Sequence, residues 1–170
     1  MSAPSLERHL RDANSDDLET IIEIYNASIP CNLATGDTNA ISVESRRQWF
    51  AEHNADTYPL WVVDNAKGQV MAWLGFQRFY GRPAYYKTAE LSIYVTPEFQ
   101  SQGLGKYLLE TAITASPSLG IQTLLGYIFA HNNPSISLFR RHGFEDWGLL
   151  PGVAELAGEE RDLLILGRKV

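Results

Sequence analysis

Apolar residues in the first part of the chain recur at helical spacing. Leu18, Ile21 and Tyr25 lie three or four positions apart and follow Asn14, a residue type that caps helices. Two aspartates between the cap and Leu18 suit the positive end of a helix. This pattern predicts a helix that starts after Asn14 and ends before Pro30, because the residue preceding a proline disfavours helical geometry.

Helical and strand patterns then alternate along the chain. A second helix is expected to start at Ser42, with Val43, Trp49 and Phe50 on its apolar side. Strands are expected over residues 60–63, 70–76, 88–95, 123–130, 144–149 and 162–166, and further helices over 105–116 and 134–142. The strands at 60–63 and 70–76 read as a hairpin. The order predicts a mixed α+β fold, with one sheet covered by helices.

Composition excludes several classes of protein. The chain has 170 residues, which favours a single domain over 1–170, and a net charge of −6, which argues against a nucleic-acid partner. The longest apolar runs, at 123–130 and 163–166, are far shorter than the roughly 20 residues of a membrane helix. Residues 1–14 lack the apolar core of a signal peptide. We therefore expect a soluble, cytoplasmic protein with no membrane partner.

Metal and thiol chemistry have little support in the sequence. The four histidines show no metal-ligand spacing, so no metal is expected. Cys31 is the only cysteine and cannot form an internal disulfide. We interpret it as a buried, inert thiol rather than a nucleophile.

Residues 90–106 carry the clearest chemical signal. A strand runs into a loop that ends in Gly103-Leu104-Gly105 at the start of a helix, where free N–H groups favour a phosphate. A Walker A loop would need glycine at Gln100 and Ser or Thr at Tyr107, so that motif is absent. By itself the Gly-x-Gly fits a plain loop-to-helix turn equally well.

Two segments together resemble a known family. QSQGLG at 100–105 resembles the acetyl-CoA loop, Gln/Arg-x-x-Gly-x-Gly/Ala, of the GNAT acetyltransferase superfamily. NNPSISLFRRHGF at 132–144 resembles its Asn-x-x-Ser/Ala-x-x-Leu-Tyr-x-x-x-Gly-Phe element. Scattered matches, such as Tyr25-Asn26 and Trp49-Phe50, are similar to the phosphinothricin acetyltransferase-like branch. The resemblance implies a mostly antiparallel mixed sheet of six to seven strands, with a splayed centre and helices on both faces.

The resemblance also implies where acetyl-CoA binds. The pantetheine arm is expected along Ile93, Tyr94 and Val95, the pyrophosphate on Gln100, Ser101, Gln102, Gly103, Leu104, Gly105 and Lys106, and the distal pantetheine at Asn132 and Ser135. The implied reaction is direct attack of a neutral amine on the thioester, with a backbone N–H of the splayed strand stabilising the oxyanion.

Glu90 occupies the position of the glutamate proposed as the base in this branch. By strand alternation it shares a face with Ser92 and Tyr94. An amine is mostly protonated at neutral pH, so the reaction needs a proton acceptor. The alternative is a solvent-facing glutamate on a half-exposed strand. Many superfamily members reprotonate the thiolate with a tyrosine where this chain has Phe139, so Tyr127 or water is left for that step.

The acceptor is implied only as a class: a small primary amine, an amino acid or analogue of the phosphinothricin or methionine sulfoximine kind. A basic residue is frequent in the branch where this chain has Tyr80; Arg78 and Arg82 lie nearby, and Trp73 and Tyr85 are further candidates for the acceptor pocket. Acidic and small residues at 155–162 replace the branch's aromatic and basic ones, which puts phosphinothricin itself in doubt and opens the possibility of a more cationic amine. The resemblance also implies a homodimer.

Two other functions remain open from sequence. The change at Phe139 and in the 153–161 loop is compatible with a sensor that binds acetyl-CoA without turnover. A protein N-terminal acetyltransferase is a further alternative, and it would require an open groove for a peptide.

Overall fold

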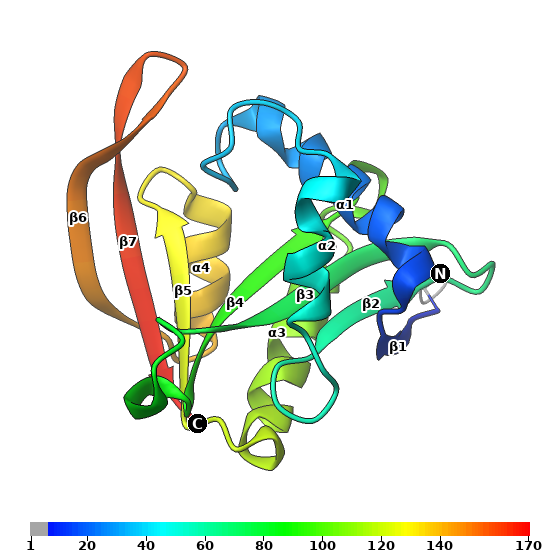
Figure 1. Ribbon diagram of the computed structural model, residues 1–170. Coiled ribbons are helices and arrows are strands. Elements are labelled where there is room, and N and C mark those ends of the chain that lie inside the picture. Colours follow the sequence, from blue (N-terminus) through cyan, green and yellow to red (C-terminus); the bar gives the residue numbers. More distant parts are fainter. Residues whose placement is uncertain (1–6) are drawn as a thin grey trace, which may run out of the picture.

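The computed structural model describes residues 7–170 (Figure 1). The first six residues of the expected 1–170 domain, and of the segment 1–14 considered as a leader, lie outside it. The strands are β1 (His9–Asp12), β2 (Leu60–Asp64), β3 (Val70–Arg78), β4 (Thr88–Val95), β5 (Thr123–Phe129), β6 (Glu145–Leu156) and β7 (Glu159–Lys169). The helices are α1 (Leu18–Ser28), α2 (Val43–Ala51), α3 (Leu104–Ala115) and α4 (Asn133–Arg141).

The strands form one sheet in the order β1-β2-β3-β4-β5-β7-β6. Neighbouring strands are antiparallel except β4 and β5, which are parallel and joined through α3. Helices α1 and α2 cover one face, and α3 and α4 cover the other (Figure 1). The structure therefore confirms the expected mostly antiparallel mixed sheet with helices on both faces. The sheet has seven strands, within the expected six to seven.

Strand alternation builds a separate core on each face. Leu74 of β3 and Leu91 of β4 pack with Leu108 of α3, while Trp73 packs with Ile21 of α1. Because consecutive side chains point to opposite faces, Glu90, Ser92 and Tyr94 of β4 all lie on the α1–α2 face.

The sheet parts between its two parallel strands. β4 and β5 are in register only at Thr88–Thr123, Ala89–Leu124 and Glu90–Leu125. β5 continues to Phe129 along β7, whereas β4 continues to Val95 along β3. The edge of β4 beyond Glu90 therefore has no strand partner on this side, which confirms the splayed centre.

Local signals fix the helix starts as expected. The Asn14 side chain accepts a hydrogen bond from the Asp16 amide, and Asp17 accepts one from the Asn14 amide, in a reciprocal cap. Ser42 caps α2 through the Ser45 amide. Gly143 ends α4 with φ +77°, a left-handed conformation that costs glycine least.

The expected secondary structure was incomplete at the two ends of the chain. β1 was missed, and the strands expected at 144–149 and 162–166 are too short, since β6 and β7 run on into a long hairpin. The register of β6 is broken by bulges between Asp146 and Gly148 and between Leu150 and Ala154, which obscures its strand pattern in the sequence.

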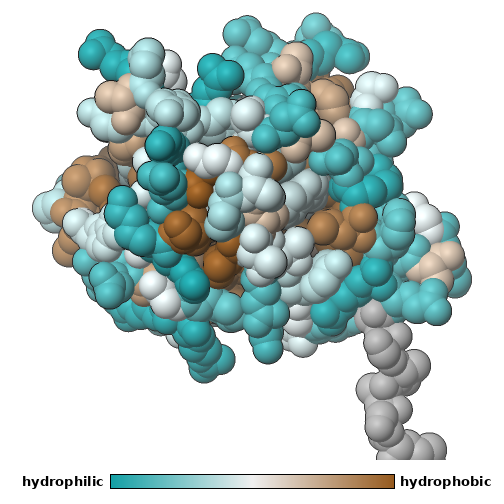
Figure 2. Space-filling model, turned by 90° about the horizontal axis from the view of Figure 1, so that it is seen from below, coloured by the Kyte–Doolittle hydropathy of each residue, from teal (hydrophilic) through white to brown (hydrophobic). Residues whose placement is uncertain are grey.

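The surface has an ordinary polar character. Figure 2 shows a face on which hydrophilic side chains predominate, interrupted by separate hydrophobic patches. None of the helices within residues 7–170 has the length and apolar character that a membrane crossing requires.

Candidate active site

A groove of about 500 Å³ occupies the gap between the parted strands. Its walls come from β4, β5, α4 and the segment 33–36, with Val153, Ala154 and Leu163 of the last hairpin at its border. Seven of the residues expected in the site line it: Glu90, Ile93, Tyr94, Val95, Gly105, Asn132 and Ser135. The structure thus gathers into one groove residues from four separate parts of the chain, at 33–36, 90–105, 127–139 and 153–163.

The start of α3 lies beside this groove and is open to an anion. Gly103 precedes the helix with φ +79°. The first amides of a helix have no intrahelical acceptor, and within residues 7–170 no side-chain cap takes that place here. Leu104 has its side chain in the core at 1% exposure, so only its backbone can face a ligand. Lys106 is exposed, with its ammonium 3.7 Å from Glu110.

Arg8 is a neighbour of this loop that sequence reasoning missed. Its guanidinium donates to the Gln102 carbonyl oxygen at 2.6 Å and lies 5.5 Å from the centre of the Tyr107 ring. It adds a second positive charge, besides Lys106, near the free amides. No local pattern connects residue 8 with residue 102.

Glu90 lies where β4 and β5 separate. It is opposite Gln77 on β3 and Leu125 on β5, the last pair before the groove opens. Burial raises the pKa of the Glu90 carboxyl above that of a free glutamate, and no partner within residues 7–170 offsets this effect. A half-buried carboxylate with a raised pKa is suited to accept a proton near neutral pH.

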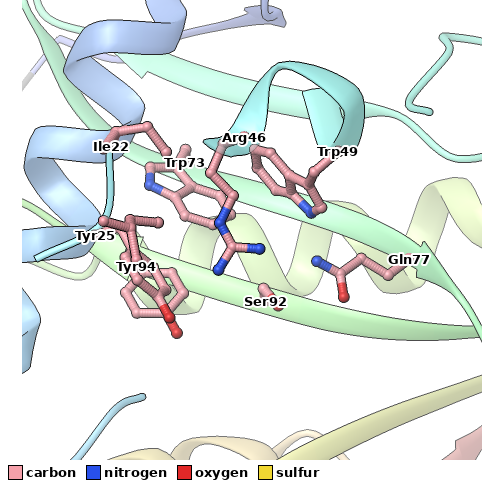
Figure 3. Close-up of a pocket in the computed structure, with 9 residues that line it drawn as sticks. Ile22, Tyr25, Arg46, Trp49, Trp73, Gln77, Ser92 and Tyr94 are labelled. Atoms are coloured by element: carbon pink, nitrogen blue, oxygen red, sulfur yellow. The ribbon is translucent and has the colours of Figure 1, made fainter. Parts of the chain in front are cut away.

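A second, smaller cavity of about 210 Å³ adjoins the groove on the α1–α2 face (Figure 3). Ser92 and Tyr94 line both spaces. The remaining lining residues are the apolar or aromatic Ile22, Tyr25, Ile41, Trp49 and Trp73, and the polar Arg46 and Gln77. The cavity has the mostly apolar and aromatic walls, with a few polar groups, that are typical of a pocket for a small organic molecule.

A short segment closes the space between the two parted strands. We call residues 32–36, between α1 and α2, the strap. Tyr94 Oη donates to the Ala34 carbonyl oxygen at 3.1 Å, and Asn132 Nδ2 donates to that of Leu33 at 3.1 Å. The strap is thus attached to β4 on one side of the groove and to the start of α4 on the other.

Asn132 has a further structural contact. Its Oδ1 accepts a hydrogen bond from the Ser135 amide and caps α4. Both polar ends of this buried side chain are therefore engaged by the protein itself.

The residues suggested for acceptor binding lie in more than one space. Trp73 lines the small cavity, whereas Arg78 and Tyr80 line an adjacent one that shares Trp49 and Gln77 with it. Arg78 also lines a third space together with Arg82, and the ring of Tyr85 lies 5.8 Å from that of Tyr80. The cavity residues that were missed include Arg46, which precedes Trp49 by three positions and so shares its helix face.

The acidic residues of the last hairpin lie outside the lining of the small cavity. Residues 155–161 form the tip of the β6–β7 hairpin, while Val153 and Ala154, just before them, border the groove. The expectation of a more cationic acceptor stays a prediction.

The aromatic residues at the groove's far wall differ in polarity. Phe139 is buried against Phe144 and has no proton to give. Tyr127 lines the groove, and burial, together with the charge of Glu90, raises the pKa of its phenol.

Cys31 is exposed, so its expected burial is wrong. It lies in a single turn after α1, where its thiol donates to the Ser28 carbonyl oxygen at 2.8 Å, and it lines neither the groove nor the small cavity.

Comparison with known proteins agrees with this architecture. Residues 18–144 match the model of the Acetyltransferase (GNAT) family. The chain is 47% identical over 161 residues to "Putative phosphinothricin acetyltransferase YwnH" of Bacillus subtilis, covering 95% of this chain and 98% of that protein. It is 30% identical over 157 residues to the L-methionine sulfoximine/L-methionine sulfone acetyltransferase of Pseudomonas aeruginosa, covering 92% and 91%.

A solved structure shows the same fold with a bound ligand. The GNAT superfamily phosphinothricin acetyltransferase from Sinorhizobium meliloti, in complex with AcCoA, superposes with a TM-score of 0.90 at 31% identity, covering 96% of this chain and 88% of that one. The parted sheet and the similarity to these acetyltransferases together identify the protein as an acyl-transferring enzyme. The chain belongs to the GNAT acetyltransferase family, within its phosphinothricin acetyltransferase-like members, and is an N-acetyltransferase.

Proposed function

We propose that this enzyme transfers the acetyl group of acetyl-CoA to the primary amine of a small amino acid or amino-acid analogue, of the phosphinothricin or methionine sulfoximine kind. One observation carries the proposal. The groove in the parted sheet and the small aromatic cavity meet at Ser92 and Tyr94, next to Glu90. A donor and an acceptor bound in these two spaces would have their reacting ends close together.

The groove fits the pantetheine arm of acetyl-CoA. The edge of β4 from Leu91 to Val95 has no strand partner on its β5 side, and an extended amide-containing chain can pair with such an edge. At the far end, the uncapped amides from Gly103 to Lys106 suit the pyrophosphate. Arg8 and Lys106 add positive charge beside these amides.

When bound, acetyl-CoA supplies an activated acetyl thioester. Glu90 accepts a proton from the acceptor ammonium, directly or through one water, and leaves a neutral amine. The amine nitrogen bonds to the acetyl carbon, the C–S bond breaks, and the CoA thiolate leaves. The nitrogen loses its second proton as the amide forms, and the thiolate takes up a proton in its place, directly or through water. A backbone N–H on the open edge of β4 stabilises the charge that develops on the carbonyl oxygen.

Release of CoA thiol across an amine panel tests the proposal. The panel holds L-methionine sulfoximine, phosphinothricin, proteinogenic amino acids, a polyamine and a short peptide. The assay uses the Cys31→Ser variant, because the exposed Cys31 thiol would react with the detecting reagent. We expect release that depends on both acetyl-CoA and an amino-acid-type amine.

The other outcomes separate the alternatives. Tight binding of acetyl-CoA without thiol release from any amine would identify a sensor. Turnover with the peptide alone would identify a protein N-terminal acetyltransferase. Either result would overturn the proposed small-molecule acceptor.

A further inference from the structure

We infer that Arg46 binds the carboxylate of the acceptor, so that the small cavity selects α-amino acids over amines that lack a carboxylate. The inference rests on the proposed function and names the group that this site recognises at the end away from the reacting amine.

Arg46 is the one formally charged side chain among the nine that line the small cavity. It projects from α2, one helical turn before Trp49, and Figure 3 shows its guanidinium between the aromatic rings, directed toward Ser92. The rest of the lining offers a carboxamide, hydroxyls and apolar surface. An anionic group is therefore the natural partner in this cavity.

The guanidinium is held in place but keeps donors free. Its Nη2 lies 3.4 Å from Asp37 Oδ2, and its carbon lies 5.8 Å from the centre of the Tyr25 ring. Tyr25 in turn donates to Asp37, which is not a lining residue. A guanidinium has five N–H donors in a planar fork, so one long bond to Asp37 leaves enough for a carboxylate.

The opposite side of the cavity leads toward the proposed base. Gln77 lines the cavity and is the cross-strand partner of Glu90, and Ser92 follows Glu90 on the same face. An α-amino acid carries its amine and its carboxylate on one carbon. An α-amino acid bound with its carboxylate on Arg46 would direct its amine toward Glu90. Its side chain would then face the aromatic walls of the cavity.

The charge of Arg46 also disfavours other acceptors. A polyamine would bring further positive charge close to the guanidinium without a compensating anion, which is repulsive. Desolvating the guanidinium under a neutral amine would likewise leave its donors unpaired. The cavity therefore distinguishes acceptors that carry a carboxylate from amines that lack one.

The simpler alternative is that Arg46 only supports the strap through Asp37. In that case its removal would lower stability and affect all acceptors equally. A carboxylate-binding role predicts an effect confined to acceptors that have the carboxylate, and this difference separates the two roles.

The test compares L-methionine sulfoximine with its α-carboxamide in the wild type, Arg46→Gln, Arg46→Lys and Arg47→Gln. Arg47 is the matched control, because it is the next residue of α2, is exposed, pairs with Glu44 and lines no part of the cavity. For Arg46→Gln we expect KM for the carboxylate acceptor to rise roughly 10- to 100-fold, while kcat, KM for acetyl-CoA and KM for the carboxamide change about twofold or less. Arg46→Lys should recover part of the loss, and Arg47→Gln should match the wild type.

Equal effects of Arg46→Gln on both acceptors, or a wild type that prefers the carboxamide, would overturn the inference. The wild-type comparison requires no variant, so it decides even where Arg46→Gln does not fold. Calorimetric titration of both acceptors into the CoA-bound enzyme repeats the test without turnover. Carboxylate-selective binding without acetyl transfer would support the role of Arg46 and overturn the proposed function. Acetyl transfer without carboxylate selectivity would overturn only the role of Arg46.

Discussion

The side-chain amide of Asn132 donates a 3.1 Å hydrogen bond to the backbone carbonyl oxygen of Leu33, a residue 99 positions earlier in the chain. Together with the bond from Tyr94 to Ala34, this contact holds the strap over the point where groove and cavity meet. The family element that begins at Asn132 thus fixes the strap that lines the groove, in addition to contributing Asn132 and Ser135 to the same groove.

Replacing Asn132 should loosen the strap. Asn132→Ala removes the bond to Leu33 and the cap of α4, so we expect a loss of about 1–2 kcal/mol in the free energy of unfolding. Because Asn132 and the strap line the groove, we also expect a higher KM for acetyl-CoA. Asn133→Ala is the control, since Asn133 is the adjacent, exposed residue. Denaturant unfolding and steady-state kinetics measure both effects. Equal behaviour of the two variants would contradict the role given to Asn132.

Glu90→Gln tests the proton acceptor. The variant keeps the shape of the side chain but cannot take a proton, so kcat/KM should fall roughly 10²- to 10⁴-fold. Because burial raises the pKa of Glu90, the acid limb of the wild-type kcat/KM profile should lie at a higher pH than the titration of a free glutamate.

The pH profile distinguishes a base from a structural residue. In Glu90→Gln the acid limb that belongs to Glu90 should disappear, and any remaining pH dependence should follow the acceptor amine. Glu23→Gln, at an exposed position of α1, serves as the control and should keep the wild-type profile. A Glu90→Gln enzyme with an unchanged profile would show that Glu90 is not the base.

The Phe139 ring packs so closely on Gly126 at the groove wall that position 126 has no room for a side chain. A Cβ at position 126 would lie 2.7 Å from Phe139 Cε1, closer than side chains tolerate. Gly126→Ala should therefore cost about 1–3 kcal/mol of stability and, because Phe139 lines the groove, raise KM for acetyl-CoA. The double variant Gly126→Ala/Phe139→Leu has room for the methyl group and should recover part of both losses. Additive effects in this cycle would contradict the contact.

Most of the fold could be predicted because its signals are local. β4 spans Thr88–Val95 as expected, since its apolar alternation ends at Pro97, and Ser42 and Asn14 mark the beginnings of helical segments. β1 could not be found because its four residues include one apolar side chain, Leu10. It is a strand only through its pairing with β2, about fifty residues away.

The groove and the small cavity also differ in how far local sequence signals could predict them. The residues expected to bind acetyl-CoA could be proposed from sequence because they belong to two continuous motifs, at 90–106 and 132–144. The groove walls at 33–36 and 127–129 belong to neither motif. The small cavity is assembled from α1, α2, β3 and β4, and no motif spans those elements. Composition likewise does not show that the hairpin tip at 155–161 stays out of the lining of the small cavity, because that is a tertiary property.

The network around Arg11 should make stability depend on acid pH. Arg11 bonds Asp17 Oδ2 at 2.7 Å and Asp64 Oδ2 at 2.7 Å, and so joins β1, β2 and the start of α1. The hydrogen bond from Arg11 lowers the pKa of Asp17 below that of a free aspartate. A lowered folded-state pKa contributes stability above the unfolded-state pKa, and this contribution is lost as pH falls through the folded-state value.

Asp17→Asn removes this charge with little change of shape. We expect the variant to lose about 1.5–3 kcal/mol relative to the wild type at pH 7. The difference should shrink as the pH falls through the folded-state pKa of Asp17, because the wild-type carboxyl then becomes protonated as well. Urea unfolding at a series of pH values from neutral to acid measures the difference. Asp16→Asn, at the neighbouring exposed aspartate, should follow the wild type throughout. If Asp17→Asn were destabilised equally across the whole pH series, its effect would come from packing and not from the ion pair with Arg11.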